Sequence, residues 1–207
     1  FVLVPVGKVR NKRILTCITR TRTGALILVG DKGLLLRSTD GKTWKKPKHP
    51  RLADALEDLH ITKYGILAAG DHGLMLVSND DGLSWRWLAD IPVREGDDRK
   101  NYHELHAVQV SDMHLIVQIR NHNKANVGET LQSESTDGGR TWTMPHSIGV
   151  WGLPSFLLRL RDGRLLMTYG HRRPPFGNQA RFSSDRGRTW SEPVIVSGDG
   201  AGGDLGY

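Results

Sequence analysis

Two charged residues stand at the ends of neighbouring apolar runs in the middle of this chain. Glu104 lies at the start of the run in YHELHAV, and Arg120, followed by Asn121, closes the run LIVQI. A glutamate buried at such a position is costly without a partner, and an arginine at the same end of a sheet supplies one. The pair is therefore either a structural ion pair or part of a site that carries chemistry.

Several histidines lie close to this pair in the sequence and raise the question of a metal. They are His103, His106, His122 and His171. His103 and His106 are three residues apart, so on a strand their side chains point to opposite faces of the sheet. The pattern favours polar lining of a channel mouth over a zinc site, whose ligands must converge. We expect no metal and no cofactor.

The elements that must position these residues are revealed by a repeat. Four segments share the pattern Ser-x-Asp-x-Gly-x-(Thr/Ser)-Trp, at residues 38–44, 78–85, 135–142 and 183–190, the first being one residue shorter. The tryptophans that close the segments recur every 41 to 57 residues. Ser and Asp can bond nearby backbone amides and so close a tight turn, and Gly supplies a positive φ.

Apolar runs flank each copy of the repeat, as in LLLRS before the first copy and LMLVS before the second. Each unit is therefore predicted to be strand, turn and strand. A period of about 40–50 residues with strands indicates propeller blades. We predict an all-β fold with one propeller domain over residues 1–207 and blades at about 10–50, 51–90, 100–148 and 151–197.

One segment does not fit the strand pattern. In residues 52–60, LADALEDLH, the residues Leu52, Leu56 and Leu59 have helical spacing with acidic residues between them. The segment is predicted to be either one short helix or the beginning of the inner strand of the second blade.

The composition limits the classes of function. No apolar run approaches the ~18–20 residues of a membrane span, and Cys17, the single cysteine, excludes an internal disulfide and a cysteine metal cluster. The net charge is +7, but the basic residues are scattered. An anionic substrate and a generally basic surface fit this charge equally well, and we expect no nucleic-acid partner.

The four repeats resemble the Asp boxes, or BNR repeats, of the sialidase (neuraminidase) superfamily and related propellers. The resemblance implies a sialidase-like β-propeller of six blades, with the boxes on the side away from the active site. Four boxes account for four blades and the start of a fifth. We therefore expect either a piece of a six-bladed parent or a ring that closes in an unusual way.

The third blade is the most similar to those enzymes. Bacterial and animal sialidases carry a Glu at the start of an inner strand, a hairpin, a strand that ends in Arg-Asn, and then a box. Glu104, Arg120 and Asn121 precede the box at residues 135–142 in that order.

The other blades carry further matches to sialidase positions. Arg13 begins an Arg-Ile-Leu segment similar to the Arg-Ile-Pro motif, with Leu15 in place of the proline. Asp31 stands where the family has its acid/base aspartate, although it is equally well a hairpin-turn residue. Arg172, with Arg173 as the alternative, takes the place of the third arginine, and Tyr207 follows about 35 residues later, where the family has its tyrosine nucleophile.

The resemblance implies an exo-sialidase that removes terminal sialic (nonulosonic) acid with retention. Arg13, Arg120 and Arg172 would hold the sugar carboxylate by charge-assisted bonds. Glu104 would take the proton of the Tyr207 phenol, which attacks the anomeric carbon.

Asp31 would then protonate the leaving oxygen. The partner implied is a sialylated glycan or another anionic sugar. The alternative is a non-catalytic Asp-box propeller that binds a partner or assists assembly, which the first two blades also resemble.

Overall fold

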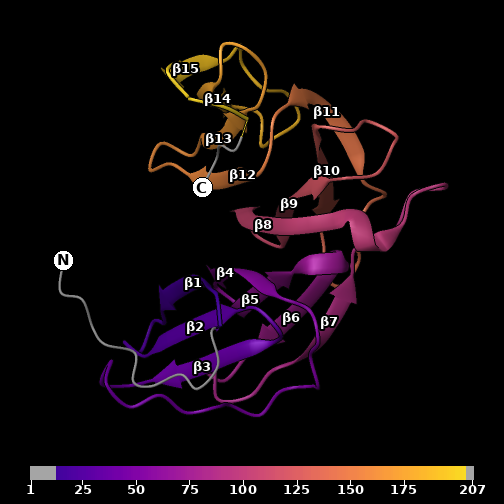
Figure 1. Cartoon of the computed structure of the whole chain (residues 1–207). Coiled ribbons are helices and arrows are strands. Elements are labelled where there is room, and N and C mark those ends of the chain that lie inside the picture. The colour runs from indigo at the N-terminus through magenta and orange to yellow at the C-terminus, as the bar shows by residue number, and fades with distance from the viewer. Residues whose placement is uncertain (1–12, 204–207) are drawn as a thin grey trace.

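The computed structural model describes residues 13–203 and shows four antiparallel sheets that follow one another along an arc (Figure 1). Within each sheet the strands are neighbours in sequence order, as in propeller blades. The strands are β1 (Leu15–Arg20), β2 (Leu26–Gly30) and β3 (Leu34–Ser38) in blade one; β4 (Leu56–Thr62), β5 (Gly65–Gly70), β6 (Leu74–Ser78) and β7 (Arg86–Asp90) in blade two; β8 (Tyr102–Ser111), β9 (His114–Asn121), β10 (Glu129–Ser135) and β11 (His146–Trp151) in blade three; and β12 (Ser155–Arg159), β13 (Leu165–His171), β14 (Gly177–Ser183) and β15 (Val194–Ser197) in blade four.

The predicted class is confirmed: the chain is an all-β, sialidase-like propeller of four blades. In the part of the chain that the structure describes, helix is limited to two three-residue 3₁₀ turns, η1 (Asp71–Gly73) and η2 (Arg99–Asn101). None of these helices has the length and hydrophobicity that crossing a membrane requires. The strand predicted for residues 1–9 lies outside the described residues.

The Asp boxes form the turns that lead to the outermost strands. Three of them connect β6 to β7, β10 to β11 and β14 to β15. In the third box, Ser135 Oγ donates to Asp137 Oδ1 at 2.8 Å and accepts from the Gly139 amide at 2.8 Å, while the Thr141 amide donates to Asp137. These donors hold the pKa of Asp137 at about 2 despite partial burial, so the carboxylate that closes the turn is ionised at neutral pH.

The first box is one residue shorter than the other three, and the strand predicted to follow it does not form. The box follows β3 and ends in a single bridge between Arg37 and Lys45 in place of an outer strand. Among residues 13–203, blade one therefore has three strands where the others have four.

Apolar side chains fill the space between successive blades. One cluster joins Ile27 and Val29 of blade one to Leu56 of blade two, and Trp85 of the second box packs into it. A second cluster joins blades two and three, and a third joins blades three and four. The cores thus lie between the sheets, so each blade is stabilised by its neighbours.

The inner strands β1, β4, β8 and β12 are also joined by polar bonds, which share one pattern. Thr16 Oγ1 donates to the carbonyl of Leu56, the Ala107 amide donates to Asp58 Oδ2 at 2.9 Å, and the Leu157 amide donates to His106 Nδ1 at 3.3 Å. At each of these three joints, a side chain of the earlier blade bonds the backbone of the later one. The bonds satisfy backbone groups at the free edges of the inner strands.

The segment 52–60 is resolved in favour of a strand, and no helix forms there. Leu56–Thr62 is β4, the inner strand of blade two, and Leu56 and Leu59 enter the core between blades one and two. The helical spacing of the leucines is overridden because β4 pairs with β5 through a bulge near Leu56, which changes the side-chain alternation.

Candidate active site

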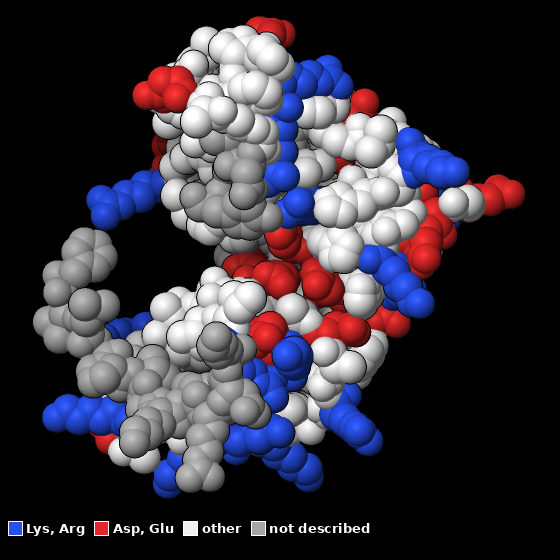
Figure 2. Space-filling model, in the orientation of Figure 1, with Lys and Arg blue, Asp and Glu red and all other residues white. Residues whose placement is uncertain are grey.

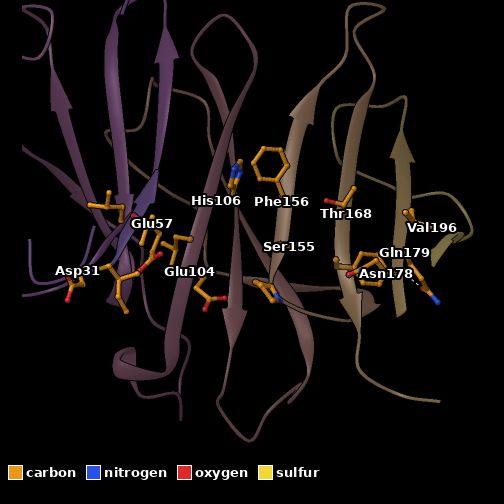
Figure 3. Close-up of a pocket in the computed structure, with 16 residues that line it drawn as sticks. Asp31, Glu57, Glu104, His106, Ser155, Phe156, Thr168, Asn178, Gln179 and Val196 are labelled. Atoms are coloured by element: carbon orange, nitrogen blue, oxygen red, sulfur yellow. Dashed lines mark hydrogen bonds between the residues drawn. The ribbon is translucent and has the colours of Figure 1, made fainter. Parts of the chain in front are cut away.

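A cleft of about 850 Å³ lies at the inner ends of the four blades and is the candidate active site (Figure 3). The space-filling view shows acidic side chains gathered in the hollow between the N-terminal and C-terminal sheets (Figure 2). All four blades contribute to the lining, which consists of Ile14, Leu15, Thr16, Asp31, Glu57, Glu104, Leu105, His106, Pro154, Ser155, Phe156, Thr168, Tyr169, Asn178, Gln179 and Val196.

The cleft has two chemically different sides. Blades one, two and three supply Asp31, Glu57 and Glu104, which we call the acidic wall. Blade four supplies uncharged side chains, the neutral wall: Pro154, Ser155, Phe156, Thr168, Tyr169, Asn178, Gln179 and Val196.

Glu104 occupies a bulge in β8 that directs it toward the cleft. His103 pairs with Arg120 and His106 with Gln118, so two residues of β8 face one residue of β9. Glu104 itself has a φ of 44°. This left-handed conformation costs about 1–3 kcal/mol for a non-glycine residue, and such outliers are concentrated at functional sites.

Arg120 lies beside Glu104, as the sequence predicts. Its Nη1 donates to Glu104 Oε1 at 2.7 Å, and its Nε donates to His122 Nε2 at 2.8 Å. The structure thus brings together the two residues that the sequence pairs at the ends of neighbouring strands.

Arg172 approaches the same region from blade four. Burial lowers the pKa of His122, and the positive charges of Arg120, His103 and Arg172 lower it further. Two arginines from adjacent blades therefore lie near one neutral imidazole. The described residues that line the cleft include Glu104 but neither of these two arginines.

Arg13 and Asp31 lie together at the edge of blade one. Asp31 lines the cleft and occupies the turn after β2, so it is a turn residue that also faces the cleft, and its acid/base role stays a prediction. Its Oδ1 accepts from the Ile14 amide at 3.1 Å. The Arg13 guanidinium donates to the backbone carbonyls of Asp31 and Lys32, at 3.1 and 2.7 Å.

Tyr207 lies outside the described residues. The loop that leads toward it is tied to blade four, where the Gly200 amide donates to the Phe176 carbonyl at 3.0 Å.

The family of the chain follows from its sequence. A profile described as BNR repeat-like domain matches residues 6–201. The chain belongs to the BNR repeat-like domain family. Comparison with curated proteins gives no match.

Solved structures of BNR-like propellers and glycosidases have the same fold. A protein of unknown function from Dyadobacter fermentans is 24% identical over 92% of this chain and 66% of its own, with a TM-score of 0.76. An alpha-L-arabinanase from Penicillium chrysogenum, complexed with arabinobiose, is 16% identical over 87% of this chain and 66% of its own, with a TM-score of 0.64.

The NanB sialidase of Streptococcus pneumoniae is 17% identical over 84% of this chain and 29% of its own, with a TM-score of 0.58. The chain thus spans just under two thirds of the first two of these structures and less of the third. At these identities the similarity establishes the shared fold, and the neighbours include sugar-cleaving enzymes.

Glu57 is a cleft residue that the sequence prediction misses. Burial raises its pKa to about 7, and the negative charges of Asp71 and Glu104 contribute to the rise. A carboxyl group of this kind is partly protonated at neutral pH and can donate a proton. The signal was present in LEDLH, because Glu57 alternates with the core residues Leu56 and Asp58, but the helical spacing of the segment obscured it.

The neutral wall holds its polar groups through a short network. The Tyr169 hydroxyl donates to Gln179 Oε1 at 2.8 Å, and Arg181 Nε donates to the Tyr169 oxygen at 3.0 Å. This assignment directs the Gln179 amide oxygen to Tyr169 and leaves its NH₂ group as a donor toward the cleft.

Three histidines near Glu104 and Arg120 pack against one another with their rings inclined. The ring centroids of His72 and His103 are 5.9 Å apart, and those of His103 and His122 are 5.0 Å apart. Among residues 13–203, no group of three or more His, Cys, Asp or Glu side chains is arranged to hold a metal ion.

Proposed function

We propose that this BNR repeat-like chain forms the larger part of a retaining exo-glycosidase that removes a terminal sialic (nonulosonic) acid. The observation that carries the proposal is the Glu104–Arg120 pair, held at 2.7 Å where a strained bulge opens onto the cleft. The fold that the chain shares with the NanB sialidase supports the same class of reaction.

In this proposal, Glu104 acts on the nucleophile. A neutral phenol suits a substrate whose own carboxylate repels anionic nucleophiles, but a free tyrosine with a pKa of ~10 is a poor nucleophile. We assign Tyr207 as that nucleophile and Glu104 as the base that takes its proton. Asp31, across the acidic wall, would protonate the leaving oxygen and then activate water.

The arginines would bind the substrate carboxylate. Arg120 contacts Glu104, and Arg172 approaches His122 from the adjacent blade. A guanidinium can bind a carboxylate through two parallel bonds. Arg13 would complete the set from blade one, where its guanidinium would exchange backbone carbonyls for the substrate.

A second candidate is supported by the acidic wall itself. Most glycosidases use two carboxyl groups, one of them protonated, and Glu57 and Glu104 fit that requirement. Such a site would cleave a neutral sugar such as an arabinofuranoside, the class named for the arabinanase neighbour.

A panel of fluorogenic glycosides tests these candidates on the full-length protein. Release of the fluorophore from an α-sialoside, inhibited by a sialic-acid glycal, supports the first proposal. Release from an α-arabinofuranoside alone supports the second. Binding of a glycan without release from any substrate would show the non-catalytic propeller that the first two blades also resemble.

A further inference from the structure

The backbone of Glu104 is held by a residue of another blade. Asp71, the first residue of η1 in blade two, accepts a hydrogen bond at its Oδ1 from the Glu104 amide, at 3.0 Å. Asp71 is half-buried and is not among the residues that line the cleft. Asp71 therefore acts on the cleft from outside it: it holds the backbone of Glu104, and its charge helps to raise the pKa of Glu57.

Asp71 is ionised when it makes this bond. Burial opposes ionisation, but the His103 imidazole, whose Nδ1 lies 3.7 Å from Asp71 Oδ1, and the bond from the Glu104 amide lower the pKa of Asp71 below its usual value. A hydrogen bond from an amide to a carboxylate is charge-assisted and stronger than a neutral one. Such a bond can hold a residue in a conformation that its own backbone disfavours.

The same turn occurs in blade one, but only in blade two does its aspartate bond the next blade. Gly-Asp-x-Gly occurs at residues 30–33 and again at 70–73, after the second strand of each blade. In both turns the backbone amide of the aspartate donates to a carbonyl just before the inner strand. Asp31 donates to Ile14, and Asp71 donates to Ala55. The Asp31 carboxylate bonds within its own blade, whereas that of Asp71 reaches forward to blade three.

Glu104 is therefore fixed at both ends. Asp71 holds the amide in the left-handed conformation, and Arg120 holds the carboxylate. Without the Asp71 bond, β8 is free to relax into a regular strand, and the alternation of side chains would then turn position 104 away from its present direction.

We propose that Asp71 is a positioning residue, whose carboxylate holds the β8 bulge and thereby directs Glu104 into the cleft. The inference rests on the proposed function, in which Glu104 is the group that acts on the nucleophile. It adds a residue outside the cleft to the working parts of the site.

The test compares Asp71→Ala with Asp71→Asn on the full-length protein. Alanine removes the acceptor, and we expect kcat on a sialoside to fall about 10- to 100-fold with KM nearly unchanged, as misplacement of a reacting group produces. Asparagine keeps an acceptor oxygen in the same place, and we expect it to restore most of the lost kcat.

His60→Ala is the matched control. His60 accepts from the Gln109 amide at 2.9 Å, so this variant also removes a bond between blade two and β8, but away from the cleft. We expect it to lower the Tm without changing kcat. An equal fall in kcat for His60→Ala, or an asparagine variant as impaired as the alanine variant, would overturn the inference.

A crystal structure of Asp71→Ala separates this inference from the proposed function. If the wild type cleaves no glycoside, the proposed function fails, but the position of Glu104 can still be measured. Loss of the positive φ at Glu104 or of its contact with Arg120 supports the inference, and an unchanged bulge contradicts it.

Discussion

The two walls of the cleft differ in what their side chains can do. The acidic wall carries carboxyl groups whose protonation depends on one another, since the charges of Asp71 and Glu104 help to raise the pKa of Glu57. The neutral wall carries amides, hydroxyls and the Phe156 ring, which can bind a sugar without changing charge. Under the proposed function, blades one to three would supply the chemistry and blade four would supply recognition.

The largest effect is expected from Glu104 on the acidic wall. Glu104→Gln keeps the shape and the contact with Arg120 but removes the base, so we expect kcat on a sialoside to fall about 10²–10⁴-fold. Glu192→Gln, on the exposed surface of blade four, is the control. Turnover by Glu104→Gln at the wild-type rate would show that the acidic wall does not act on the nucleophile.

A smaller effect is expected from Arg120, which contacts Glu104 of the acidic wall. Lysine is a point charge and cannot form the two parallel bonds of a guanidinium. We expect Arg120→Lys to raise KM for a sialoside about tenfold, the change that 1.4 kcal/mol of binding free energy produces. An arabinofuranoside carries no carboxylate, so an equal rise in its KM would count against carboxylate binding by Arg120.

The neutral wall should respond in KM and not in kcat. Gln179→Ala removes one hydrogen-bonding group, and we expect KM to rise roughly 2- to 10-fold, since one such bond contributes about 0.5–1.5 kcal/mol. A fall in kcat with unchanged KM would show that blade four also takes part in the chemistry, and it would contradict the proposed difference between the two walls.

The smallest effect is expected from Glu57, where a substitution should increase the stability of the protein instead of impairing its activity. The pKa of Glu57 is raised to about 7, so the folded state binds this proton more tightly than the unfolded chain. Its contribution to stability is complete below about pH 4.5, the ordinary value, and is lost as pH rises through 7. Glu57→Gln cannot ionise, so we expect its Tm to exceed that of the wild type at pH 8.

Thermal melts of both proteins at pH 5 and pH 8 check this prediction. A change of 1 kcal/mol shifts the Tm by about 2–4 °C in a domain of this size, so the difference is measurable. A Tm difference that does not depend on pH would show that Glu57 does not titrate in this range.

The parts of the structure that could be predicted are those in which local sequence determines local geometry. The boxes were predictable because Ser135 and Asp137 bond amides within four residues of themselves. The neighbouring ends of β8 and β9 followed from the hairpin that joins them, which places Glu104 near Arg120.

The parts that could not be predicted depend on contacts between blades. The pKa of Glu57 is set by burial and by charges from η1 and β8. The bond from the Glu104 amide to Asp71 spans 33 positions of the chain. No local pattern encodes these distances, although the second Gly-Asp-x-Gly turn was visible as a repeat.

The bonds between the inner strands distinguish the earlier blade from the later blade at each joint. At each joint the earlier blade offers a side chain, Thr16, Asp58 or His106, and the later blade offers its backbone. A chain emerging from the ribosome folds its N-terminal parts first, so each new blade meets partners that are already in place. Rearranging the order of the blades would leave all four boxes intact and yet mismatch the joints. These three side chains differ from one joint to the next and so help to specify the order of the blades, whereas the last three boxes share one pattern.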